Sequence, residues 1–300
     1  MPILGILAIM SSRGNSEASA RGSAHSGQQV DETAEAPAGS KGWSVEEQAA
    51  FWSKKRQERK ARKRERSASA KEGKQREWET LTEEEREKRR AEAAEVHRLR
   101  KAKADAHEAA CKTNAADLSR PALLFDLAFW DVMKETGRKS TVSQLKFAYS
   151  SLKKAEFPLR PVMTSLDTSD QYLAGLAAYE GFKSIPPVTS PKHWSEVVDQ
   201  KASKIVYLSA DSTNLLQKIE SNCTYVVGAF VDHNTKKGLT EENAKKFGVE
   251  TARLPLDETI AVGNMCKVLT INHVTDVLVK FHETNSWAEA FTVLPTRRNN

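Results

Sequence analysis

The chain has 300 residues, of which 46 are Lys or Arg and 40 are Asp or Glu, so its formal net charge is +6. No run approaches the roughly 20 apolar residues of a membrane-spanning helix, and we expect a soluble protein without a membrane segment. Cys111, Cys223 and Cys266 lie far apart, a pattern that favours neither a disulfide framework nor a metal site. We therefore expect a reducing compartment.

The positive charge is concentrated in one part of the chain. Residues 1–40 contain two basic and four acidic side chains, residues 41–120 contain 23 and 16, and residues 121–300 contain 21 and 20. This asymmetry indicates a polyanionic partner for the middle segment. We interpret residues 1–40 as a disordered tail, residues 41–118 as a basic, partly helical RNA-binding extension, and residues 119–298 as one globular domain.

The extension has helix signals at two places. Ser44, followed three residues later by a glutamate, predicts a helix start. Gly73 is expected to interrupt this helix, and Thr82 to begin a second one. Residues 54–66 include nine basic and two acidic side chains, a density that suits phosphate binding. The expected phosphate contacts come from Lys54, Lys55, Arg56, Arg59, Lys60, Arg62, Lys63 and Arg64.

The same basic run has two other interpretations, a nuclear-import signal and a solvated charged helix. Aromatic residues are few within it, so we expect it to set RNA affinity rather than base choice. We expect the protein in the nucleus, in the cytoplasm or in both, and the same basic residues could serve nuclear import. Residues 1–30 are rich in Ser and Ala and contain two arginines, which leaves a mitochondrial presequence as the weaker alternative.

The globular domain alternates apolar runs with helix-like periodicity. Strands are expected at Pro121–Phe129, Leu159–Ser165, Lys204–Ser209, Tyr225–Val231 and Val249–Leu254. Helices are expected at Thr141–Glu156, from Ser212 through Ile219, at Leu239–Phe247, through Val268–Phe281 and through Trp287–Leu294. The segment containing Pro186 and Pro187 is expected to be irregular. Alternating strands and helices predict an α/β fold, with a parallel sheet covered by helices on both faces.

The apolar run Tyr225–Val231 ends on Asp232 and Asn234. Open α/β sheets bind their ligands at the carboxyl ends of the strands, so a carboxylate and a carboxamide at this tip are candidate functional groups. A strand-closing turn is the plainer interpretation, because Asp and Asn bond readily to nearby backbone. Asp126 also ends an apolar run, and there a buried structural carboxylate is an equal possibility.

Four segments in this order resemble a known family. They are Ile205–Ser212, Tyr225–Asn234, Arg253–Leu256 and Lys267–Val274. Together they are similar to the tRNA N1-purine methyltransferases that act at position 9, the atypical monomeric branch of the SPOUT class. The resemblance covers roughly residues 119–298. It implies a C-terminal trefoil knot, S-adenosyl-L-methionine as cofactor, tRNA as partner, no metal, and a monomer that uses the basic extension in place of a second subunit.

The resemblance also assigns roles to residues. Cofactor contacts are implied for Leu208, Ser209, Gly228, Asp232, Leu254, Leu256, Lys267, Val268, Leu269 and Asn272. Asp232 is implied as the catalytic carboxylate, with Gln144 and Asn234 beside it. Apart from the resemblance, we expect Lys153 and Arg160 to extend the RNA-binding surface, with ordinary surface lysines on a helix as the alternative interpretation. Ala229 departs from the Gly-Gly that the family usually has at this point. Met265 and Cys266 stand where relatives commonly have polar or basic residues.

The implied reaction is methylation of N1 of guanosine at position 9, which requires loss of the N1 proton. An ordinary Asp, with a pKa of about 3.9, is a weak base for this step. If N1–H is about five units less acidic, full transfer would cost roughly 7 kcal/mol. Orientation of the base by Asp232, with partial proton acceptance, is therefore the favoured role. Methylation of adenosine or of both purines, and a non-catalytic tRNA-binding subunit, remain as alternatives.

Overall fold

The computed structural model describes residues 43–231, 238–260 and 269–295. Contacts between residues divide the chain into two units, residues 1–86 and residues 87–300. None of the helices in these ranges is both long and apolar enough to cross a membrane.

The first unit contains a long exposed helix, α1 (Val45–Thr80). Its start is confirmed, because the Glu47 N–H donates to Ser44 Oγ at 3.2 Å and the Ser44 N–H donates to Glu47 Oε2 at 2.7 Å. The expected interruption at Gly73 is wrong, since α1 continues through it. One glycine costs a helix about 1 kcal/mol, and the Glu, Lys, Gln and Arg residues around it are strong helix formers that offset this cost.

The second helix, α2 (Glu83–Ala116), begins where the sequence indicates a new start. The Glu85 N–H donates to Thr82 Oγ1 at 3.3 Å, and the Thr82 N–H donates to Glu85 Oε2 at 2.8 Å. From Glu87 onward, contacts group α2 with the second unit. Most of α2 is exposed, but Cys111 is fully buried in the core. The predicted domain boundary after residue 118 falls in the connection that follows this helix.

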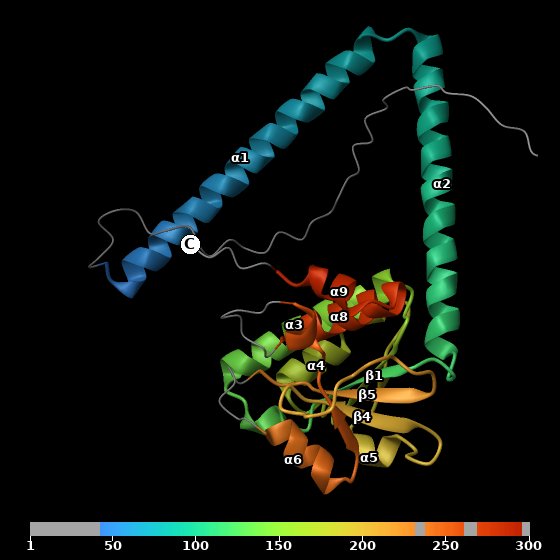
Figure 1. Cartoon of the computed structure of the whole chain (residues 1–300). Helices are drawn as coiled ribbons and strands as arrows, with labels where there is room; N and C mark the ends of the chain where they lie inside the picture. The colour runs from blue at the N-terminus through green and yellow to red at the C-terminus, as the bar shows by residue number, and fades with distance from the viewer. Residues whose placement is uncertain (1–42, 232–237, 261–268, 296–300) are drawn as a thin grey trace, which may run out of the picture. The chain divides into compact units, whose positions relative to one another are not determined.

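The second unit is built on six parallel strands in the order β3-β2-β1-β5-β4-β6. Figure 1 labels three of them, β1, β5 and β4, which lie side by side. Their bounds are β1 Ala122–Asp126, β2 Arg160–Thr164, β3 Val188–Thr189, β4 Lys204–Leu208, β5 Cys223–Gly228 and β6 Glu250–Ala252. The predicted parallel sheet is confirmed. Strands β1 and β5 are the central pair, and they are buried on both faces, which explains why the sequence shows them as continuous apolar runs.

Helices cover both faces of the sheet. The α-helices of this unit are α3 Glu135–Lys154, α4 Gln171–Ala177, α5 Trp194–Val197, α6 Leu239–Lys246, α7 Leu256–Thr259, α8 Ile271–Thr284 and α9 Trp287–Ala290. Short 3-10 turns occur at η1 Trp130–Val132, η2 Glu180–Phe182 and η3 Phe291–Val293. Helices α3 and α8 pack beside each other on one face, and α5 and α6 lie on the other (Figure 1). Side chains alternate accordingly, with Phe125 in the first core cluster and Leu124 in the second.

Two sequence expectations need correction here. Ser212 opens no helix: the Leu216 N–H donates to the Arg253 carbonyl at 2.8 Å, and the Arg253 N–H donates to the Asn214 carbonyl at 2.8 Å. These backbone groups extend the sheet beyond β6 and are not available to a helix. The segment around Pro186 is not wholly irregular, because β3 follows it directly. The trefoil knot stays a prediction.

Candidate active site at the carboxyl edge of the sheet

The carboxyl ends of β1, β5, β4 and β6 lie side by side. Asp126 pairs in register with Gly228, and Leu208 pairs with Val227 and Ala252. Leu208 and Gly228 are partly exposed, although Ile205–Tyr207 and Cys223–Val227 before them are buried. The sheet is thus open to solvent at the edge where α/β folds bind ligands.

Gly228 has no room for a side chain on its Cβ side. A methyl group added there would lie 2.9 Å from Thr240 Cγ2, 3.1 Å from the Phe230 ring and 3.4 Å from the Phe129 ring. The family resemblance implies that this glycine allows a cofactor to approach the backbone. The structure adds a second reason, which is the close packing of α6 and two aromatic rings against the strand end.

The chain entering Asp232 is fixed by contacts with β1 and with the start of α3. The Ala229 N–H donates to the Asp126 carbonyl at 2.8 Å, and the Val231 N–H donates to Met133 Sδ at 3.2 Å. A Cβ added at Gly137 of α3 would lie 2.5 Å from the Val231 carbonyl oxygen, so only glycine fits there. Asp232 and Asn234 themselves lie outside the described residues.

Ala229, which departs from the family pattern, is fully buried in the core. Its methyl group packs in the first core cluster together with Met133. The structure therefore accommodates this methyl inside the protein.

The start of α6 is hydrogen-bonded to the residues that follow β4. The Thr240 hydroxyl donates to Ser209 Oγ at 2.9 Å, and the Gly238 N–H donates to Asp211 Oδ2 at 2.9 Å. Gly238 has a φ of 75°, a left-handed conformation that favours glycine. Ser209, which the sequence assigns to the cofactor, is only 6% exposed and uses its hydroxyl to join β4 to α6.

Beneath this edge, Asp126 is a buried carboxylate. The Tyr207 hydroxyl donates to its Oδ2 at 2.9 Å, and the Ala128 N–H donates to its Oδ1 at 3.0 Å. Burial raises the pKa of Asp126, and these two hydrogen bonds oppose the rise. The pKa of Tyr207 is also raised, first by burial and then by the charge of Asp126. Of the two possibilities open for Asp126, these contacts fit a structural carboxylate.

Gln144 connects α3 to the start of α8. Its Oε1 accepts the Ile271 N–H at 3.0 Å, and its Nε2 donates to Ser140 Oγ at 3.1 Å. The first N–H groups of a helix have no partner within the helix, so Gln144 satisfies one of them from a distant element. Asn272 Oδ1 accepts from the Thr270 hydroxyl at 2.9 Å.

The expected cofactor residues near α8 are only partly described. Lys267 and Val268 lie outside the described residues, as do Met265 and Cys266. Leu269 lies just before α8 and packs against the third core cluster.

The segment between β6 and α7 carries two expected cofactor residues. Leu254 is partly buried and packs against both the first and the third core clusters, while Leu256 is buried at the start of α7. Next to them, the Arg253 guanidinium donates to Glu258 Oε2 at 2.9 Å and to Oε1 at 2.5 Å. This bidentate contact links Arg253, which follows β6, to Glu258 within α7.

The comparison with known proteins identifies the family. A family model described as tRNA (guanine(9)-N(1))-methyltransferase TRM10/TRM10A matches residues 42–299. The chain belongs to the TRM10 family.

TRM10 relatives match more than half of this chain at moderate identity. The rat tRNA methyltransferase 10 homolog A is 35% identical over 185 residues, covering 59% of this chain and 52% of the relative. The tRNA (guanine(9)-N1)-methyltransferase of Schizosaccharomyces pombe is 32% identical over 181 residues, covering 59% of this chain and 58% of the relative. The chain spans about half the length of the mammalian relatives it matches.

A solved TRM10 structure shares the fold. The crystal structure of full-length spTrm10 in complex with SAH superposes with a TM-score of 0.54 at 29% identity, covering 60% of this chain and 95% of that chain. This likeness confirms the SPOUT-type parallel sheet covered by helices. The family model begins at residue 42, so the basic extension belongs to the TRM10 match as well.

Two expected RNA-binding residues of this TRM10 chain lie far from the carboxyl edge. Arg160 begins β2, and Lys153 lies in the last turn of α3, so both are at the amino edge of the sheet. Arg160 Nε donates to the Arg120 carbonyl at 3.4 Å, and burial lowers the pKa of its guanidinium. Lys153 Nζ donates to Ser184 Oγ at 2.7 Å. RNA binding by these two side chains stays a prediction.

The sequence did not identify three residues that contact the chain at and just after the ends of β5 and β4. Gly137, Met133 and Thr240 contact the strand ends only in the folded chain. Gly137 lies before the helix expected from Thr141, and only the structure, in which α3 begins at Glu135, shows it as a helix glycine that packs closely. Met133 and Thr240 have no recognisable signal. Among the described residues, no cluster of His, Cys, Asp and Glu has an arrangement that could hold a metal ion.

Proposed function

We propose that the protein transfers a methyl group from S-adenosyl-L-methionine to N1 of guanosine at position 9 of tRNA. The match of residues 42–299 to the tRNA (guanine(9)-N(1))-methyltransferase family carries this proposal. The names of the fission-yeast and other fungal relatives state the same activity for those proteins. The SAH complex of spTrm10 supports the cofactor, because SAH is what remains of S-adenosyl-L-methionine after methyl transfer.

The residues at the carboxyl edge fit such a cofactor. Leu208, Leu254 and Leu269 are partly exposed leucines, and Leu254 packs with the same core clusters as the other two. Partly exposed apolar side chains suit the flat adenine ring. When bound, the cofactor supplies an electrophilic methyl group. We assign its binding to these leucines and Gly228, together with Ser209, Leu256, Lys267, Val268 and Asn272.

The protein's own contribution to the reaction is orientation of the guanine base. We assign to Asp232 the acceptance of the N1–H hydrogen bond, with partial proton acceptance as N1 becomes nucleophilic. The contacts that fix Val231, through Met133 Sδ and against Gly137, support this role because they hold the chain directly before Asp232. Asn234 and Gln144 complete the proposed catalytic group, Gln144 by holding the start of α8.

We assign RNA affinity to the basic extension, because residues 41–120 have a net charge of +7 whereas residues 121–300 have a net charge of +1. Its lysines and arginines neutralise phosphates and release counterions, so tRNA binding should weaken steeply with salt. In this proposal the enzyme works as a monomer in the nucleus or cytoplasm.

The test uses the full chain, labelled S-adenosyl-L-methionine and a pair of tRNA transcripts that differ only in having guanosine or adenosine at position 9. Mapping of the labelled nucleotide should find N1-methylguanosine in the first transcript alone. Label in the adenosine transcript would contradict the guanosine assignment. Failure to label either transcript, with tRNA binding retained, would indicate a non-catalytic binding subunit.

A further inference from the structure

Four glutamates of α1 lie along one side of the helix and five basic residues lie along the opposite side, where Glu77 recurs at the angular position of Arg59. Glu58, Glu65, Glu72 and Glu79 follow one another at intervals of seven residues. Because seven residues fall about 20° short of two full turns in a straight helix, these four glutamates form one nearly straight stripe. We call it the acidic face.

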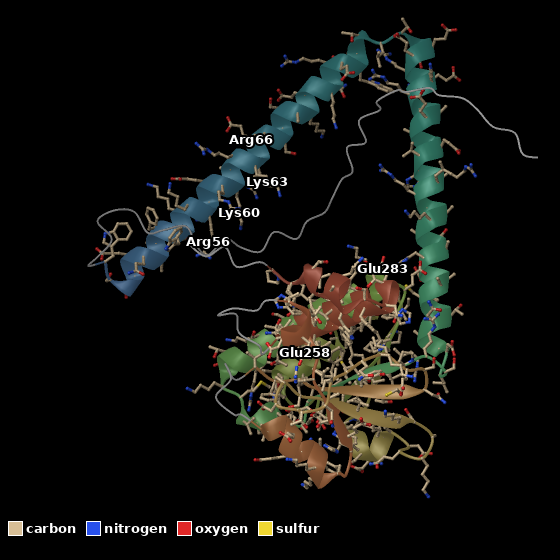
Figure 2. All side chains as sticks on the ribbon, in the orientation of Figure 1. Arg56, Lys60, Lys63, Arg66, Glu258 and Glu283 are labelled. Carbon is tan, nitrogen blue, oxygen red and sulfur yellow. The ribbon has the colours of Figure 1, made fainter. Side chains whose placement is uncertain are left out.

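A second stripe carries the opposite charge. At about 100° per residue, Arg56, Arg59, Lys60 and Lys63 cluster on the side of the helix away from the acidic face, and Lys74 returns to the same side five turns after Arg56. We call these five residues the basic face. Figure 2 labels three of them, together with the flanking Arg66, along α1. From Arg56 to Lys74 the basic face is about 27 Å long.

The two faces differ in their partners. On the acidic face, Glu58 pairs with Lys55 at 3.8 Å, Glu72 pairs with Arg76 at 3.9 Å, and Glu79 accepts from Gln75 Nε2 at 2.8 Å. On the basic face, Arg59, Lys60 and Lys63 are exposed and have no ion-pair partner within the described part of the chain. The acidic face is therefore partly neutralised within the helix, while the basic face presents its charge to solvent.

Resting on the proposed function, we infer that α1 binds the RNA phosphate backbone through the basic face alone, with the acidic face turned away. Charge complementarity supports a phosphate backbone as the occupant, because a row of unpaired cations about five turns long fits a linear array of negative charges. Rotation of the helix by half a turn would bring four glutamates against the phosphates. The acidic face thus fixes the orientation of the helix through like-charge repulsion.

This inference divides the expected RNA contacts of the extension. Lys54 and Arg62 lie on the acidic half of α1 and should contribute little, although sequence reasoning gave them equal weight. Arg76 lies on the same half and already pairs with Glu72. A helix that used charge density alone would show no such difference, because all of these side chains are exposed.

The experiment compares two triple variants of the full chain with identical charge and composition. The first replaces the basic-face residues Arg56, Arg59 and Lys63 with Gln. The second replaces Arg62, Arg76 and Lys54 with Gln. Affinities for a tRNA transcript and for a fully paired RNA duplex are measured across a salt series, and far-UV circular dichroism verifies that α1 is intact. Methylation is measured at saturating tRNA.

The basic-face variant should bind RNA about tenfold or more weakly than the wild type. The slope of its log Kd plotted against the log of the salt concentration should fall by about 3, which is about 1 for each lost phosphate contact. The second variant should change the slope by less than about 1. Equal losses in both variants would overturn the inference in favour of diffuse attraction. Unchanged slopes in both would show that α1 does not contact RNA.

The outcomes separate this inference from the proposed function. If the wild type methylates tRNA while the basic-face variant keeps its affinity and slope, the inference fails and the proposed function stands. If RNA binding depends on the basic face but no transcript is methylated, the proposed function fails and the inference stands.

Discussion

Gln144 Oε1 accepts the backbone N–H of Ile271 at 3.0 Å, and this bond joins the middle of α3 to the first residue of α8. Helix α8 directly follows Leu269, which is assigned to the cofactor. One side chain therefore anchors the helix that begins beside the cofactor residues.

Replacement of Gln144 separates an anchoring role from a catalytic one. Gln144→Ala removes a helix cap and should cost about 1 kcal/mol, which corresponds to about 2–4 °C in Tm for a unit of this size. Gln144→Glu keeps an acceptor for the Ile271 N–H and adds a negative charge at a helix start, so it should restore stability and cofactor affinity. Calorimetric titration with S-adenosyl-L-methionine and thermal unfolding measure both. A Glu variant that is stable and binds cofactor, yet does not methylate tRNA, would assign Gln144 a direct catalytic role.

Gly228→Ala should weaken packing because the new methyl group lies 2.9 Å from Thr240 Cγ2. Overpacking of this kind costs about 1–3 kcal/mol. The second change Thr240→Ser removes Cγ2 but keeps the hydroxyl that donates to Ser209, so the double variant should recover part of the lost Tm. If Gly228 also contacts the cofactor, the double variant will recover stability without recovering S-adenosyl-L-methionine affinity. If both the Tm and the S-adenosyl-L-methionine affinity recover, the glycine is required only for packing.

Gly137→Ala should reduce methylation, because its methyl group would lie 2.5 Å from the Val231 carbonyl and displace the chain before Asp232. We expect a loss of about 1–3 kcal/mol in stability and a larger relative loss in kcat than in cofactor affinity. Gly175→Ala is the matched control, since Gly175 lies in α4 and nothing lies within 4 Å of an added Cβ. The control should be neutral or up to about 1 kcal/mol more stable. Full activity in the Gly137 variant would show that the position of Val231 does not matter for turnover.

Asp126→Asn should change the pH dependence of stability. Burial raises the pKa of Asp126 above its unfolded value, so the folded state holds the proton more tightly. The contribution of Asp126 to the stability of the wild type therefore falls as pH rises from the ordinary Asp pKa of about 3.9 through the raised folded pKa. The Asn variant lacks this titration. Urea unfolding at a series of pH values should show the stability of the wild type, relative to the variant, falling across that window. A difference that stays constant with pH would contradict a raised pKa.

The sequence predicted local structure where neighbouring residues decide it. Ser44 and Glu47 specify the start of α1 through bonds that span three residues. The apolar run that became β5 predicted a buried strand, and Asp232 at its end placed a candidate site at the carboxyl edge of the sheet. Local patterns failed at Ser212, because the backbone groups that would have built a helix bond instead to Arg253 and extend the sheet.

The sequence by itself determined the alternation of strands and helices and the uneven distribution of charge, because these depend on composition and on residues a few positions apart. The opposite faces of α1 needed the structure as well, since they depend on the helix continuing through Gly73. Only the tertiary structure decided the strand order and the contacts behind the site. Gln144 and Ile271 are 127 residues apart, and Val231 and Met133 are 98 apart. No local periodicity encodes such pairs, since their partners are chosen by close packing of the whole core.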